Sequence, residues 1–181
     1  PGSIGNVIDL VKNIQAGKLD YLEHPEKLAT LPPDEVVGLG PGGEPYVKGP
    51  DPFARSDLDP AVADAVRAAS PRPGIIIGRE FSRTVHAYVG DEITLVSPLG
   101  ELGPMGVLPR ARKFRVAAIF YSGMYEYDAS QVYVTIDAAA ELFSMDARAS
   151  AIEVRTTDAE RASDVRAAVE ARLARGDLRV R

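Results

Sequence analysis

The chain has 181 residues, of which 45% are hydrophobic and none is cysteine, and its formal net charge is −5. This composition predicts one ordinary soluble domain or two small ones, and it excludes disulfides and thiolate chemistry. The positive residues are scattered, so the sequence does not favour nucleic acid as a partner. No run approaches the roughly 20 apolar residues of a membrane span. The sequence shows no signal peptide. Because the chain begins at Pro1 and not at Met, we expect it to be part of a longer protein.

The first third of the chain predicts short helices, one short strand and a loop. A helix is expected over residues 3–17, because its apolar residues recur on one face. A second short helix and a turn are expected over 18–31, and a short strand at 36–37. Residues 38–52 are rich in glycine and proline, which predicts an irregular loop. Asp59 followed by Pro60 is typical of a helix start.

The middle of the chain predicts a buried strand, a short helix and a hairpin. Residues 74–78 form a wholly apolar, β-branched run, the pattern of a buried strand. A short helix is expected over 79–87, with Phe81, Val85 and Tyr88 facing the core. Two strand-like runs, 92–97 and 114–120, follow one another and most simply form an antiparallel hairpin.

The connector between these two strands, Pro98 to Lys113, is longer than hairpin loops usually are. Its prolines fix φ and remove backbone donors, its glycines allow tight reversals, and its apolar side chains give it a hydrophobic surface. The residues alone leave two interpretations open: a stiff, apolar arm that docks on a partner, or a loop folded back on its own core.

After the hairpin, the pattern alternates between helices and strands. The tyrosines of Tyr125 to Asp128 are expected to lie buried at a strand edge, with their tips hydrogen-bonded. Residues 131–136 predict a strand, and Asp137 is expected to cap a helix that ends near Phe143. A strand over 151–155, a helix opened by a capping box at Thr157 and a last strand at 178–180 follow. The fold class is therefore α+β, with a boundary between 145 and 151.

Catalytic patterns are sparse in this sequence. Ser82 and His86 stand four residues apart on a predicted helix, where their side chains can meet. A serine nucleophile also needs an orienting acid and an oxyanion hole, so exposed helix polarity is the favoured interpretation and a small serine hydrolase is the alternative. The two histidines give no zinc pattern. We expect no cofactor, no metal and no enzymatic activity in this chain.

Several motifs occur in an order that resembles the LolC/LolE family, the transmembrane subunits of the bacterial lipoprotein-releasing ABC transporter. The resemblance covers residues 74–145 well and the rest more loosely. The motifs are Gly74-Ile-Ile-Ile-Gly-Arg-Glu80, Val89-Gly-Asp-Glu-Ile-Thr-Leu-Val-Ser-Pro98, Pro104-Met-Gly-Val-Leu-Pro109, Phe114-Arg-Val116 and Gly123-Met-Tyr-Glu-Tyr-Asp128.

The resemblance implies a β-rich Sabre-like subdomain over 1–148, with a protruding hairpin arm at 93–120. It implies that 149–181 is the C-terminal part of a Porter-like α+β subdomain, whose first half and membrane helices lie outside this chain. The domain would face the periplasm at the inner membrane. Its parent complex would contain a LolD-like ATPase, a second permease subunit and lipoprotein substrates.

In LolC-type subunits a protruding hairpin, the Hook, recruits the periplasmic lipoprotein carrier LolA. Its Pro-Met-Gly-x-x-Pro pattern matches Pro104, Met105, Gly106 and Pro109, and the arginine of a neighbouring basic platform matches Arg112. The platform's glutamine is replaced here by Ala111, and Arg110 supplies polarity instead. The partner-binding residues implied are Pro98, Leu99, Leu102, Pro104, Met105, Gly106, Val107, Leu108, Pro109, Arg110 and Arg112.

A second hypothesis lies in the wider transporter superfamily. The chain would then resemble the periplasmic part of a MacB- or FtsX-like mechanotransmission protein, which has a partner other than a lipoprotein carrier. The Pro-Met-Gly-x-x-Pro pattern of residues 104–109 argues against this hypothesis.

Overall fold

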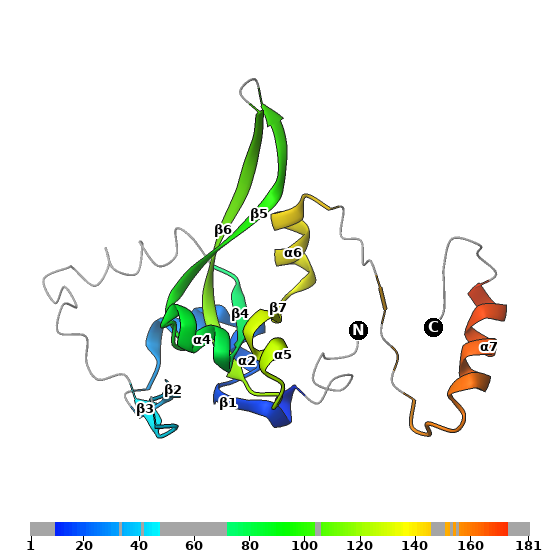
Figure 1. The fold of residues 1–181 in the computed structure, drawn as a ribbon, viewed down its shortest axis with the longest axis horizontal. Coiled ribbons are helices and arrows are strands. Elements are labelled where there is room, and N and C mark those ends of the chain that lie inside the picture. The colour runs from blue at the N-terminus through cyan, green and yellow to red at the C-terminus, as the bar shows by residue number, and fades with distance from the viewer. Residues whose placement is uncertain are drawn as a thin grey trace, which may run out of the picture.

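The computed structural model describes residues 10–47, 72–145 and 151–173, apart from residues 33, 41, 104, 105, 153 and 155. Figure 1 shows a small body of helices around a twisted sheet, from which one long hairpin projects. Its elements are η1 (Val11–Asn13), β1 (Ile14–Gly17), α2 (Asp20–Glu23), η2 (Pro25–Thr30), β2 (Val36–Leu39), β3 (Pro45–Val47), β4 (Gly74–Gly78), α4 (Arg79–Val85), β5 (Glu92–Gly103), β6 (Gly106–Phe120), α5 (Tyr125–Ser130), β7 (Val132–Val134), α6 (Ile136–Phe143) and α7 (Ala162–Leu173). This mixture confirms the α+β class.

The main sheet has the order β1-β6-β4-β7, with β5 also paired to β6. Strand β4 runs parallel to β6, whereas β1, β5 and β7 pair antiparallel with their neighbours. Every residue of β4 is buried, which confirms the strand predicted from its apolar run. The three isoleucines of β4 and the inner end of β6 form the centre of the hydrophobic core.

Strand β6 changes its surroundings at Arg115. At this residue it pairs with Glu92 of β5 and with Gly74 of β4. Toward Phe120 it lies between β4 and β1, and toward Gly106 its described partner is β5 alone. Residues 106–114 therefore leave the sheet as part of a two-stranded hairpin, about 30 Å long at the usual rise of a strand.

The predicted helix over 3–17 is wrong from Ile14 onward, and residues 3–9 lie outside the described part of the chain. Ile14 to Gly17 form β1, which pairs with the inner end of β6. Gly17 has φ +74°, and a Cβ there would collide with the carbonyl oxygen of Ala117. Pairing with a distant strand thus outweighs the local helical pattern, because propensity is a weak prior.

The remaining N-terminal expectations have mixed outcomes. The short helix and turn over 18–31 are confirmed as α2 and η2, with Tyr21, Leu22 and Leu28 buried. The strand at 36–37 is confirmed and extends to Leu39. The irregular loop expected over 38–52 is partly wrong, since β3 pairs with β2. The helix expected after Pro60 lies outside the described residues.

The C-terminal half also follows the predictions in part. Helix α6 begins at Ile136 and is capped by Thr135 rather than Asp137, since the Thr135 hydroxyl accepts from the Ala138 N–H at 3.3 Å. Residues 151, 152 and 154 lie outside any strand. Helix α7 is present where the capping box predicted a helix, and none of its residues is buried. The strand at 178–180 lies outside the described residues, and the division at 148/149 stays a prediction.

Candidate functional site

The segment Pro98 to Lys113 is mostly strand rather than irregular connector. Strand β5 continues to Gly103 and β6 begins at Gly106, with Leu102 paired to Val107. The hairpin stands away from the body in Figure 1, and the side chain of Leu108 is 61% exposed. The described part of this segment is therefore an extended arm and is not folded back on the core.

A bulge interrupts the hairpin halfway along its length. Ser97 pairs with Arg110 and Glu101 pairs with Leu108, so residues 98–100 of β5 stand opposite Pro109 alone. Proline donates no hydrogen bond and is tolerated in strands at such interruptions. Gly100 has a steric role there, because a Cβ on it would collide with the carbonyl oxygen of Leu108.

The base of the hairpin has two unequal faces. Cross-strand partners share a face, and Ile93, Leu95, Arg112 and Phe114 form the covered face, which is buried or half-buried. Thr94, Val96, Ala111 and Lys113 form the uncovered face, where all four side chains are exposed. Among them is the apolar side chain of Val96, which is 61% exposed.

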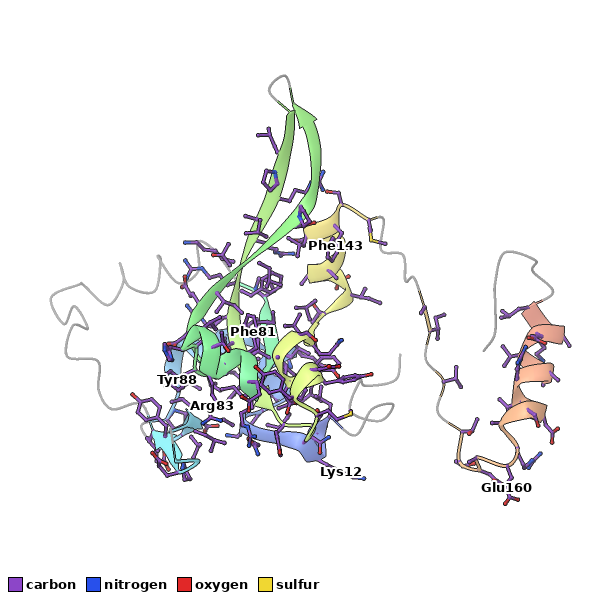
Figure 2. All side chains as sticks on the ribbon, viewed as in Figure 1. Lys12, Phe81, Arg83, Tyr88, Phe143 and Glu160 are labelled. Atoms are coloured by element: carbon purple, nitrogen blue, oxygen red, sulfur yellow. The ribbon has the colours of Figure 1, made fainter. Side chains whose placement is uncertain are left out.

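Arg112 is bound within its own domain. Its Nη1 donates to the carbonyl oxygen of Ala138 at 3.0 Å, and its guanidinium forms an ion pair with Glu141. The guanidinium carbon lies 5.8 Å from the centre of the Phe114 ring. The arginine predicted to belong to a basic platform is thus tied to helix α6. Figure 2 shows this helix, labelled at Phe143, beside the hairpin.

The other predicted partner-binding residues follow the hairpin outward. Pro98, Leu108 and Pro109 are exposed, and Arg110 is half-buried. Gly106 has φ +115°, a conformation that favours glycine, next to the tip. Two of the predicted residues, Pro104 and Met105, lie outside the described part of the structure, as do the side chains of Leu99, Leu102 and Val107.

Ser82 and His86 do not form the arrangement of a serine hydrolase. The Ser82 hydroxyl is buried and donates to the carbonyl oxygen of Ala87 at 2.6 Å, which closes the end of α4. His86 is exposed and adopts φ +53° just after the helix. Val85 on the same helix was expected to face the core and is instead exposed.

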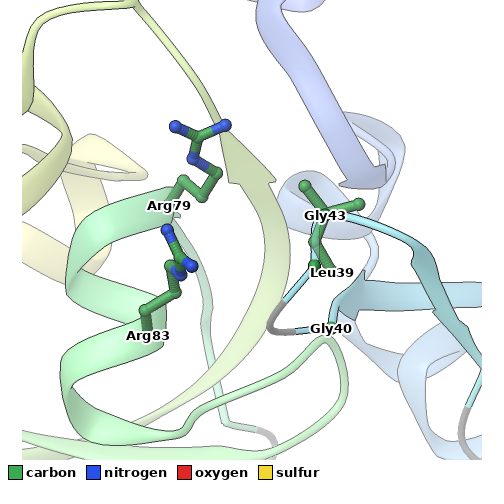
Figure 3. A pocket seen from close by; sticks show the side chains of 6 residues that line it. Leu39, Gly40, Gly43, Arg79 and Arg83 are labelled. Carbon is green, nitrogen blue, oxygen red and sulfur yellow. The ribbon is translucent and has the colours of Figure 1, made fainter.

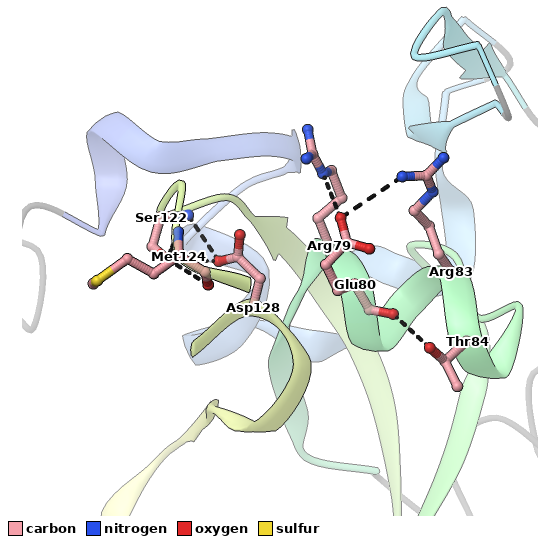
Figure 4. Close-up of polar contacts among 7 residues, drawn as sticks. All are labelled: Arg79, Glu80, Arg83, Thr84, Ser122, Met124 and Asp128. Carbon is pink, nitrogen blue, oxygen red and sulfur yellow. Dashed lines mark hydrogen bonds and ion pairs between the residues drawn. The ribbon is translucent and has the colours of Figure 1, made fainter. Parts of the chain in front are cut away.

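The segment after β6 places a buried carboxylate where tyrosine tips were expected. Tyr125 is 70% exposed and Tyr127 is also exposed, so that expectation is wrong. Asp128 is fully buried, and its Oδ1 accepts from the N–H and the hydroxyl of Ser122, both at 2.8 Å (Figure 4). Sequence reasoning missed this role, although a serine six residues before an aspartate is compatible with such a turn.

One open pocket of about 230 Å³ lies between α4 and the β2–β3 turn (Figure 3). Its lining residues are Leu39, Gly40, Gly42, Gly43, Arg79 and Arg83. Both arginines contact the carboxylate of Glu80, at 3.3 and 3.7 Å, and the Arg79 guanidinium stacks 3.7 Å from the centre of the Tyr121 ring. The neighbouring carboxylate offsets their charge, so this pocket is a weak candidate for an anion site.

Among the residues that the structure describes, no three metal-binding side chains gather in one place. In the same ranges, no helix combines the length and apolarity that crossing a bilayer requires. The fold and the hairpin therefore define an α+β domain that presents a projecting β-hairpin, with one uncovered face at its base.

Comparison with known proteins relates this domain to one group. No protein-family model matches the chain. The lipoprotein-releasing system transmembrane protein LolC of Neisseria meningitidis is 31% identical over 88 residues, which cover 49% of this chain and 21% of that protein. LolC of Xylella fastidiosa is 26% identical over 107 residues, which cover 58% and 26%.

These matches establish that the chain is a relative of the LolC proteins over about half of its length. They agree with the family resemblance drawn from the motifs. The chain itself spans only about a fifth to a quarter of the length of these relatives.

Proposed function

We propose that this chain is the periplasmic domain of a lipoprotein-releasing ABC transporter permease, and that its hairpin recruits a LolA-type lipoprotein carrier. The domain would lie at the periplasmic face of the inner membrane, in a complex with a LolD-like ATPase and a second permease subunit. There the carrier would receive lipoproteins bound for the outer membrane. The observation that supports this proposal best is the projecting hairpin in a relative of LolC.

The chemistry of the hairpin suits an apolar partner cavity. Leu108 is exposed on its outer half, and in the sequence Pro104 and Met105 separate β5 from β6. A carrier of acyl chains offers an apolar cavity, and each well-buried Leu or Met side chain contributes about 1.5–3 kcal/mol before ordering is counted. A hairpin that is already paired loses little freedom on docking. Arg110, half-buried on the hairpin, adds a positive charge that complements acidic groups on a carrier.

The test is titration calorimetry of this chain with a purified LolA-type carrier. Replacing Pro104→Ser together with Met105→Gln should weaken binding at least tenfold, because the apolar tip is lost while the body is untouched. Circular dichroism and the urea midpoint should stay at the parent values.

A matched control replaces two exposed apolar residues of the body, Val85→Ser and Met124→Gln. This variant removes similar apolar surface and should bind the carrier as the parent does. Equal carrier affinity for the tip variant and the parent would contradict the proposal. Capture of a hydrolase or an adaptor in place of the carrier, in parallel pull-downs, would favour the MacB- or FtsX-like alternative.

A further inference from the structure

The contact between Arg112 and helix α6 attaches the hairpin at a point that lies beyond the end of its pairing with β4. Arg112 lies three residues beyond Arg115, where the ladder with β4 ends, and so about 10 Å along the hairpin. The hydrogen bond to the Ala138 carbonyl is charge-assisted and directional. An exposed ion pair alone would fix the geometry poorly, but the carbonyl and the Phe114 ring restrict where the guanidinium can lie.

Helix α6 follows directly on β7, which pairs with β4 in the sheet, and it packs against β5 and β6. Ala138 and Leu142, one turn apart on its inner face, are buried. Its first turn is capped by the Thr135 hydroxyl. The Ala138 carbonyl lies in this first turn, four residues beyond Val134 of β7, so Arg112 links the hairpin to a second fixed point at the β7 edge of the sheet.

The foot of the hairpin provides the other fixed point. The ladder between β4 and β6 begins there, where Gly74 pairs with Arg115. The carboxylate of Glu92 adds ion pairs with Arg72 and with Arg115, the latter at 3.5 Å. The ladder between β5 and β6 holds the two strands together, but a single attachment at the foot of the hairpin leaves its direction relative to the body free to vary. Two attachments about 10 Å apart define a direction.

We infer that Arg112 and Glu141 are positioning residues that fix the angle at which the hairpin leaves the sheet. For partner binding the inference rests on the proposed function, whereas the angle is a property of this chain alone. Arg112 then acts on a carrier through the hairpin, and Glu141, 66% exposed on α6, acts through Arg112. If the carrier binds only one direction of the hairpin, only the fraction of molecules with that direction can bind. A looser angle makes this fraction smaller and so lowers the apparent affinity.

The chain contains no cysteine, so spin labels can be placed at chosen sites. We would introduce cysteines at Leu108 on the hairpin and Tyr125 on α5, both exposed, and measure the label-to-label distance by double electron–electron resonance. The parent should give one narrow distance distribution. Arg112→Ala should broaden it at least twofold, and Arg112→Lys should fall between the two, since lysine keeps the charge without the planar fork.

Lys113→Ala is the matched control, because it removes the same charge from the adjacent position on the uncovered face. Its distribution should equal that of the parent. Glu141→Gln changes an exposed helix position with little risk to folding, and it should also broaden the distribution. A parent-like distribution in both Arg112→Ala and Glu141→Gln would overturn the inference.

Carrier affinity separates positioning from direct contact. If Arg112 binds the carrier directly, Glu141 competes with it, and Glu141→Gln should bind the carrier more tightly. If Arg112 positions the hairpin, Glu141→Gln should bind about threefold to tenfold more weakly. Tighter binding would overturn the inference. If the parent chain binds no carrier, the proposed function fails, and the distance distributions alone decide the inference.

Discussion

The two halves of strand β6 differ in burial and in the number of strands beside them. Between Val116 and Phe120 every residue is buried, with β4 on one side and β1 on the other. Between Arg110 and Lys113 the residues alternate between half-buried and exposed, and the described partner strand is β5 alone. The inner half therefore stabilises the fold, and the outer half presents a surface.

This difference means that stability and binding can be changed separately in one strand. An inner substitution acts on the free energy of unfolding of the whole domain, because it opens the core. An outer substitution acts on the hairpin, which we expect to open locally without unfolding of the whole domain. The predictions below test whether the separation holds.

The largest effect is expected in the sheet. Ile76→Ala in β4 removes a fully buried side chain that packs beside the inner half of β6. It should lower the free energy of unfolding by about 2–5 kcal/mol, a large share of a typical domain's 5–15 kcal/mol. Urea unfolding followed by circular dichroism measures it.

Val96→Ala on the uncovered face is the matched control for the hairpin. It also truncates a β-branched residue of a strand, yet most of that side chain is already in water. The free energy of unfolding should change by less than about 0.5 kcal/mol. Similar losses for the two variants would show that the hairpin belongs to the cooperative core.

The second effect concerns the buried carboxylate that follows the inner half. Asp128→Ala leaves the N–H and hydroxyl of Ser122 without their acceptor and should lower the free energy of unfolding by about 1–3 kcal/mol. Asp128→Asn keeps an acceptor oxygen. It replaces only Oδ2, which has no hydrogen-bond partner among the described residues. The loss of free energy of unfolding should be below about 1 kcal/mol, measured by urea unfolding. A larger loss would show that the hydrogen bonds of Oδ1 alone do not explain the contribution of Asp128.

A third substitution should act on the hairpin alone. Gly100→Val places a side chain against the Leu108 carbonyl at the bulge, with a local cost of about 1–3 kcal/mol. Amide hydrogen exchange should speed up at least fivefold in the outer hairpin and stay unchanged in β4. Ala111→Val, on the uncovered face, should leave both regions unchanged. Faster exchange in β4 would indicate that the bulge and the body open together.

The sequence predicted the elements whose evidence is local. Residues 74–78 are apolar on both faces, so a buried strand is the expected outcome, and the regular spacing within 162–173 predicts a helix. The strand at Ile14–Gly17 was missed because its partner, the inner end of β6, lies about a hundred residues away. The spacing of apolar residues within a short segment does not indicate pairing with a strand so distant in the sequence.

The same limit applies to the candidate site. The prolines at 98 and 109 predicted stiffness, but their position at a bulge depends on the register between β5 and β6. The bond between Arg112 and helix α6 joins residues far apart in sequence, so no spacing reveals it. Exposure of Val85 and burial of Asp128 likewise depend on which elements cover them.

The smallest effect on the free energy of unfolding is expected at an exposed ion pair of the body. It tests whether the contribution of a side chain to stability depends on its burial or on whether it lies in the body or in the hairpin. Asp20 lies 2.6 Å from the Lys27 ammonium, whose hydrogen bond lowers the pKa of Asp20 below its ordinary 3.8. The ionised form is favoured in the folded state, so the stabilisation is complete above pH 3.8 and is lost as pH falls through the lowered pKa.

Asp20→Asn should therefore reduce the urea midpoint slightly between pH 5 and 7, and the difference from the parent should vanish at the acidic end of a titration. Surface ion pairs contribute little because water screens them, so the difference should be no larger than that of Val96→Ala on the hairpin. A large difference in urea midpoint at neutral pH would show that an exposed contact of the body stabilises the fold more than an exposed side chain of the hairpin does. Location would then matter in addition to burial.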